Sequence, residues 1–187
     1  MRTPSGAQVR SNPVWKRAYA RLASHAYRTA VNSNNKLYKK SFVVQNGIRF
    51  DETMVRNDPS FFINCILKAK KVAYCDGCFY EHFVNRSGSL VFQSGCYFGD
   101  VVLVFKNVFQ ISKNSDSHTF ANIMEVQFRD LFFWCQKCAG TEFESKALRD
   151  VQNFLKGFCT ENMILERCND STLEMVHRFE SIHGGMK

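Results

Sequence analysis

The chain has 187 residues, of which 45% are hydrophobic and 18 are Phe, and it carries a net charge of +8. This composition suits one packed domain and excludes a wholly disordered chain. No apolar run approaches the roughly 20 residues that span a bilayer, and no hydrophobic signal segment follows Met1, so we expect a cytoplasmic protein.

The positive charge is concentrated at the front of the chain. Residues 1–50 contain ten Lys or Arg and no Asp or Glu. Such a segment is attracted to phosphates or to an anionic membrane surface, and it also has the composition of a transit peptide. No signature of a nucleic-acid module accompanies it, so we expect no nucleic-acid partner. A peripheral position at the inner membrane face is compatible with this charge.

The first half of the chain is predicted to mix helices and strands. Near-turn spacing of apolar residues predicts a helix over 14–31. A short strand over 42–44 is followed by the turn signal Asn46-Gly47. Asp58 as N-cap and Pro59 at the first helical position predict a helix through about Lys71. Two further strands are predicted over 72–74 and 79–83.

The second half is predicted to be helical. Residues 97–110 are weakly periodic, whereas 120–135 carry a clean apolar stripe that Gly140 closes. Thr141 and Glu144 form a capping box for a helix to about residue 158. Ser171 and Glu174 form a second box, for a last helix that ends at the Gly-Gly pair 184–185.

Segment 35–90 carries a series of local motifs. It has NKLYKK at 35–40, GIRFDE at 47–52, Asn57-Asp58 before an aromatic helical turn, Tyr80-Glu81-His82, and then Arg86 and Ser87. In this order the motifs resemble the acceptor-side half of a family 2 glycosyltransferase, a class built on the GT-A fold. The first strand, the uridine-binding loop and the Asp-x-Asp metal motif of that family have no counterpart here.

The resemblance implies an α/β fold, with an incomplete GT-A-like mixed sheet, flanking helices and a helical C-terminal tail. The implied divisions are a basic segment 1–34, a glycosyltransferase-like segment 35–95 and a helical region 96–187. It also implies transfer of a sugar from a nucleotide-sugar donor to a polysaccharide or lipid-linked acceptor. We expect the isolated chain to be weak or inactive, and to need a homo-oligomer or a complementing upstream half.

The resemblance also assigns roles to individual residues. Asp58 would be the general base that takes the acceptor's proton, although its position before a proline fits a simple helix cap equally well. His82 would be a ligand of Mn or Mg. The residues implied to bind substrate are Asn57, Asp51, Glu52, Tyr80, Arg86 and Ser87.

Two other classes of function stay open at this point. One is a non-catalytic module that docks on a membrane or on a partner protein through the basic segment. The other is a zinc-stabilised domain, because Cys75 with Cys78 and Cys135 with Cys138 form two C-x-x-C pairs. Fifty-six residues separate the two pairs, far more than in a zinc ribbon, and Cys135 lies on the apolar stripe.

Overall fold

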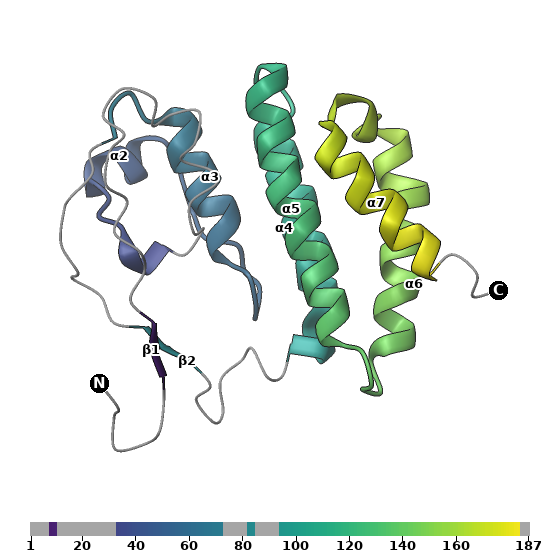
Figure 1. Ribbon diagram of the computed structural model, residues 1–187. Coiled ribbons are helices and arrows are strands. Elements are labelled where there is room, and N and C mark those ends of the chain that lie inside the picture. Colours follow the sequence, from purple (N-terminus) through teal and green to yellow (C-terminus); the bar gives the residue numbers. More distant parts are fainter. Residues whose placement is uncertain (1–7, 11–32, 73–81, 85–93, 184–187) are drawn as a thin grey trace.

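The computed structural model describes residues 8–10, 33–72, 82–84 and 94–183. The longer helices α4 and α5 lie in the middle, with α3 on one side and α6 and α7 on the other (Figure 1). Two three-residue strands, β1 (Gln8–Arg10) and β2 (His82–Val84), pair antiparallel. The helices are η1 (Ser33–Asn35), α2 (Lys40–Gln45), α3 (Asp58–Lys68), η3 (Ser94–Tyr97), α4 (Phe98–Ser112), α5 (Ser117–Lys137), α6 (Glu144–Phe154), the π-helix η4 (Leu155–Cys159), η5 (Leu165–Arg167) and α7 (Asp170–His183).

This architecture overturns the expected α/β fold and, with it, the resemblance to a GT-A glycosyltransferase. Over the described ranges the chain is helical, apart from the short β1–β2 pair, and no mixed sheet is present. The predicted helix 14–31 and most of the predicted strands 72–74 and 79–83 lie outside the described residues. The limits of the three expected divisions stay a prediction.

The predicted strand over 42–44 is wrong, because these residues belong to α2. Phe42 and Val43 both pack against a small core made of Ile48, Phe61 and Cys65. Consecutive side chains of a strand point to opposite faces, so a strand could not bury both on one side. Tertiary packing thus overrides the strand preference of a β-branched pair. The Asn46-Gly47 turn that follows is confirmed, and Gly47 takes a φ of 61°.

The prediction for α3 is confirmed at its start and corrected at its end. The helix begins at Asp58 and has Pro59 in its first turn, where a missing N–H leaves no bond unmade. Asn57, not Asp58, holds the N-cap position, and the helix ends at Lys68 instead of Lys71. The next residue, Ala69, is extended, so the lysines beyond it leave the helix axis.

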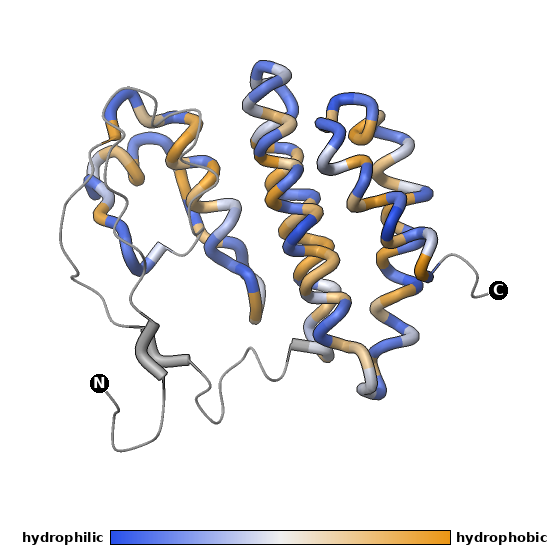
Figure 2. The backbone as a smooth tube through the Cα atoms, in the orientation of Figure 1, coloured by the Kyte–Doolittle hydropathy of each residue, from blue (hydrophilic) through white to orange (hydrophobic). Residues whose placement is uncertain are grey.

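One large hydrophobic core contains buried side chains from α3, α4, α5, α6 and α7. The apolar stripe of α5 is confirmed, with Ile123 and Phe128 fully buried. The weakly periodic segment 97–110 forms α4, which packs against α3, α5 and α6. A helix that is covered on several sides needs no single apolar stripe, which explains its weak pattern. Figure 2 shows hydrophobic residues recurring along α3, α4 and α5.

Both predicted capping boxes are wrong in detail. Glu144 is the first residue of α6, and its carboxylate accepts a bond of 2.8 Å from the backbone N–H of Gly140. At α7 the cap is Asn169 instead of Ser171, because the Asn169 side chain accepts from the backbone N–H of Thr172 at 2.9 Å. Within the described ranges, no helix is long and apolar enough to cross a membrane.

Candidate functional site

Asp58, the expected general base, is held at the first turn of α3 by η1. Its Oδ1 accepts hydrogen bonds from the backbone N–H of Ser33, at 3.3 Å, and from the Ser33 hydroxyl. Asn57 is exposed and makes no side-chain capping bond to α3. Asp58 therefore ties the segment before α2 to the start of α3. Its role as a general base stays a prediction.

The expected substrate-binding acids lie in a different environment. Asp51 Oδ1 accepts from the side-chain amide of Asn107 in α4 at 2.9 Å, and Glu52 is exposed. A few residues on, Arg56 pairs with Asp130 of α5 at 2.6 Å, although its own φ of 62° is unusual for a non-glycine residue. The loop 51–56 thus fastens α3 to the bundle. Asp51 and Asp58 therefore have different hydrogen-bond partners, Asn107 and Ser33.

The remaining expected site residues add little. Five further residues singled out by the sequence lie outside the described ranges: Tyr80, Arg86, Ser87, Cys75 and Cys78. His82 lies in β2, where its Cα is the register partner of Arg10.

The second C-x-x-C pair is buried in the main core. Burial, with further contributions from Cys138 and nearby carboxylates, raises the pKa of Cys135 to about 12. Burial likewise raises the pKa of Cys138 above its ordinary value. Both thiols thus lie within the apolar core of the bundle. Among the described residues, no group of three or more His, Cys, Asp or Glu is placed to hold a metal ion.

A compact cluster of titratable groups surrounds the start of α3. The Lys36 ammonium lies 4.6 Å from the ring centroid of Phe62 and donates to the side-chain oxygen of Asn35 at 2.6 Å. Burial lowers the pKa of Lys36 to about 8, and the neighbouring Asp58 carboxylate opposes this shift. Nothing in the sequence indicated this environment, because NKLYKK is interpreted there only as a motif of the resemblance.

Tyr38 and Cys65 complete this cluster. Burial is the main cause that raises the pKa of Tyr38 well above its ordinary value, and Cys65 and Asp58 add to it. Burial also raises the pKa of Cys65 to about 11. The Tyr38 hydroxyl is buried and has no hydrogen-bond partner among the described residues. Both groups are therefore neutral near pH 7 and could act as proton donors.

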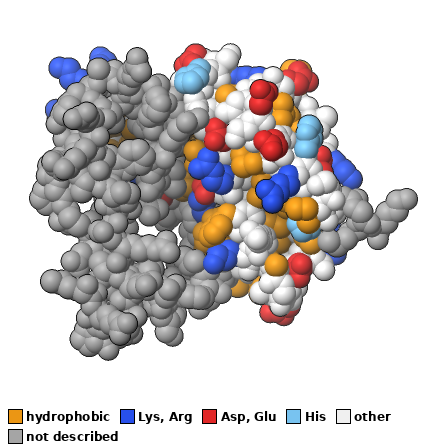
Figure 3. All heavy atoms as spheres, in the orientation of Figure 1, with side chains coloured by type: hydrophobic (Ala, Val, Ile, Leu, Met, Phe, Trp, Pro, Cys, Tyr) orange, Lys and Arg blue, Asp and Glu red, His pale blue; other side chains and the backbone are white. Residues whose placement is uncertain are grey.

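The C-terminal end of α3 carries a different chemistry. Lys68 donates to the backbone oxygen of Asn46 at 3.1 Å, which brings this end beside the turn after α2. Lys70 and Lys71 are exposed, and so are Val44 and Val72, with 67% and 42% of their surface accessible. We call these residues the basic end of α3: Val44, Lys68, Lys70, Lys71 and Val72. In Figure 3, basic side chains stand out at the upper left corner, whereas charges of both signs mix over the helical bundle.

A shallow groove of about 350 Å³ between α4 and α6 is a weaker candidate. Asp150 on its wall is paired with Lys146 at 2.6 Å, and the Lys106 ammonium lies 5.2 Å from the ring centroid of Phe158. These charged groups are thus engaged by their neighbours. The groove is lined by Gly99, Val102, Lys106, Asp150, Asn153, Phe154 and Phe158.

No family model matches the chain, and no match was found among curated proteins or among solved structures.

Proposed function

We propose that this chain is a peripheral docking module that binds an anionic phospholipid surface through the basic end of α3. The observation that carries the proposal is charge. Residues 33–72 hold eight Lys or Arg and three Asp or Glu. Two of these acids, Asp51 and Asp58, are engaged by Asn107 and Ser33. The exposed lysines at the basic end thus have no acidic neighbour among the described ion pairs.

The arrangement suits a bilayer surface in two respects. A Lys near an anionic membrane contributes about 1 kcal/mol, so the three lysines contribute about 3 kcal/mol together. Val44 and Val72 stand exposed beside them and would enter the boundary between head groups and acyl chains. Single contributions of this size give reversible association, which strengthens with the number of basic residues. The acid-free segment 1–50 adds to the same attraction.

The same surface suits nucleic acid less well. Single strands bind to basic grooves in which aromatic side chains stack on the bases. The exposed apolar side chains at the basic end are valines. Phe50 is the exposed aromatic residue of segment 33–72, and it stacks on Phe61 in the first turn of α3, at 4.0 Å between ring centroids. Phosphate attraction without a stacking platform favours lipid head groups.

Vesicle co-sedimentation tests the proposal. The full chain is expected to bind vesicles of mixed phosphatidylserine and phosphatidylcholine, to ignore pure phosphatidylcholine, and to dissociate at high salt. The double variant Lys70→Glu/Lys71→Glu is expected to weaken binding by about thirty-fold or more, because two attractive lysines are lost.

A matched control carries the same change of net charge elsewhere. Arg149 in α6 and Arg178 in α7 are both exposed. Arg149→Glu/Arg178→Glu is expected to retain most of the vesicle binding. Equal losses in the two double variants would show non-specific attraction and would overturn the proposal. Tight binding to a single-stranded RNA, with none to the vesicles, would replace the lipid by nucleic acid.

A further inference from the structure

The groove between α4 and α6 combines one face of each helix. Gly99, Val102 and Lys106 recur at intervals of three and four residues, so they share one face of α4. The facing wall, from α6 and η4, carries Asp150, Asn153, Phe154 and Phe158 at similar intervals. Sites for small molecules begin at about 300 Å³, so a groove of about 350 Å³ suits a small molecule and not a folded partner.

Two phenylalanine rings form the apolar part of the groove. Phe154 is 4% exposed, and its ring stacks on that of Phe158, with centroids 5.4 Å apart. Phe158 belongs to the π-helix η4, and single π-helical turns of this kind occur frequently at functional sites. Val102 lies partly buried on the opposite wall. The groove therefore offers an apolar surface to one part of a ligand.

One cation stands beside this apolar surface. The Lys106 ammonium lies 5.2 Å from the ring centroid of Phe158, and Lys106 is partly buried. The ring face attracts the positive charge, but it cannot engage all three N–H donors of the ammonium. Within the described ranges, Lys106 makes no ion pair and no side-chain hydrogen bond. The ammonium is thus positioned by the ring and keeps donors for a ligand.

The other polar groups of the groove set the charge of the ligand. The Asp150 carboxylate is already paired with Lys146 at 2.6 Å, so it does not call for a second cation. The charge left to balance is the single positive charge of Lys106. A ligand with one negative charge matches it, whereas a phosphate dianion would bring excess charge beside Asp150. Asn153 is exposed and adds an amide donor on the wall opposite Lys106.

We propose that the groove between α4 and α6 binds a small apolar carboxylate, an aromatic or aliphatic monocarboxylic acid. The carboxylate accepts hydrogen bonds from the Lys106 ammonium and from the Asn153 amide, while the apolar group covers Phe154 and Phe158. Charge-assisted bonds of this kind are about twice as strong as neutral ones, so the carboxylate fixes the orientation of the ligand. The site shares no residue with the basic end of α3, and it does not rest on the docking proposal.

Two probes of nearly equal shape test the role of the carboxylate. The full chain is titrated with 3-phenylpropionate and with the neutral alcohol 3-phenyl-1-propanol, and proton–nitrogen correlation NMR follows the backbone signals. The acid is expected to shift signals of the groove residues saturably, with a Kd in the millimolar range, and to bind about five-fold or more tightly than the alcohol. Equal affinities, or shifts confined to residues outside the groove, would overturn the proposal.

A pair of lysine variants locates the charge that is recognised. Lys106→Met keeps an unbranched apolar chain against Phe158 and loses the ammonium, so the acid is expected to bind no better than the alcohol. The affinity for the alcohol is expected to stay unchanged. Lys156→Met, at an exposed lysine of η4, makes the same change of charge and is expected to alter both affinities by less than about two-fold. Equal losses in the two variants would show non-specific attraction and contradict the site.

A third variant fills the groove without touching its charges. A Cβ added at Gly99 meets no atom within 4 Å, so Gly99→Leu is expected to fold and to occupy part of the groove. Both the acid and the alcohol are then expected to lose about ten-fold or more in affinity. Unchanged binding of the acid in a folded Gly99→Leu chain would place the ligand elsewhere and overturn the proposal. If this variant does not fold, the comparison of Lys106→Met with Lys156→Met decides.

Discussion

Phe128 and Phe133 lie five residues apart on α5 and have opposite environments. Phe128 is fully buried, and its ring meets that of Phe105 in α4 edge-on, with centroids 4.9 Å apart. Phe133 is 49% exposed. Five residues turn a helix by about 140° beyond one full rotation, so the two side chains cannot share a face. The contribution of a Phe in α5 to the stability of the fold therefore depends on which face of the helix carries it.

Phe128→Ala is expected to lower the free energy of unfolding by about 3–5 kcal/mol, through lost burial and a cavity between α4 and α5. Phe133→Ala is the matched control and is expected to cost less than about 1 kcal/mol. Urea denaturation followed by circular dichroism measures both values. Similar losses for the two variants would contradict the placement of the α5 stripe.

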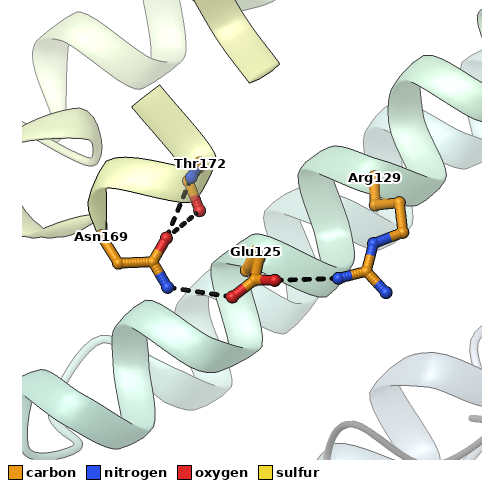
Figure 4. Close-up of polar contacts among 4 residues, drawn as sticks. All are labelled: Glu125, Arg129, Asn169 and Thr172. Carbon is orange, nitrogen blue, oxygen red and sulfur yellow. Dashed lines mark hydrogen bonds and ion pairs between the residues drawn. The ribbon is translucent and has the colours of Figure 1, made fainter. Parts of the chain in front are cut away.

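The start of α7 depends on one side chain that links two helices. Asn169 Oδ1 accepts from the backbone N–H and the hydroxyl of Thr172, at 2.9 and 2.8 Å, while its Nδ2 donates to Glu125 of α5 at 2.9 Å. Glu125 is also paired with Arg129 at 2.9 Å, as Figure 4 shows. The cap therefore closes the helix terminus and also sets where α7 lies on α5.

Asn169→Ala is expected to cost about 1–2 kcal/mol of stability, because the capping bond to α7 and the bond to Glu125 are lost together. Ser171→Ala removes the residue that the sequence pattern favoured as the cap, and it is expected to change stability by less than about 0.5 kcal/mol. Thermal unfolding of the two variants decides between the caps. A larger loss for Ser171→Ala would restore the capping box.

Buried thiols couple the stability of the whole molecule to alkaline pH. Burial raises the pKa of Cys135, Cys159 and Cys168 to about 12 each, from an ordinary value of 9.0. The pKa of each thiol is higher in the folded state than in the unfolded state. Between about pH 9 and pH 12 the folded protein therefore keeps the thiol protons that the unfolded chain releases. The stability that these protons contribute is complete below about pH 9 and is lost as pH rises toward 12.

Cys159 is fully buried, so its contribution can be isolated by substitution. The stability difference between the unaltered chain and Cys159→Ala is expected to shrink by about 1.4 kcal/mol per pH unit above pH 9. Urea denaturation over a pH series measures this difference. A constant difference for Cys159→Ala would contradict the buried state of this thiol.

The helical half of the chain was largely predictable, and the first half was not. The α5 stripe and the start of α3 depend on local spacing and on Pro59, which act whatever the rest of the chain does. The capping boxes predicted at Thr141 and Ser171 are wrong because other residues make the bonds. The Glu144 carboxylate accepts from the N–H of Gly140, and the Asn169 side chain accepts from the N–H of Thr172. In the candidate site, Asp58 was recognised as an important position, but Lys36 and Ser33 were not assigned to its surroundings.

The amino-acid sequence alone was enough to predict the helical character of residues 97–183, the burial of the α5 stripe and the excess of positive charge before residue 72. These properties follow from local periodicity and composition. Only the tertiary structure decided that residues 42–44 form a helix, that Asp51 and Asp58 have different partners, and that Lys36 differs from Lys39. Each of these depends on burial against segments distant in sequence, and burial sets both the local conformation and the pKa.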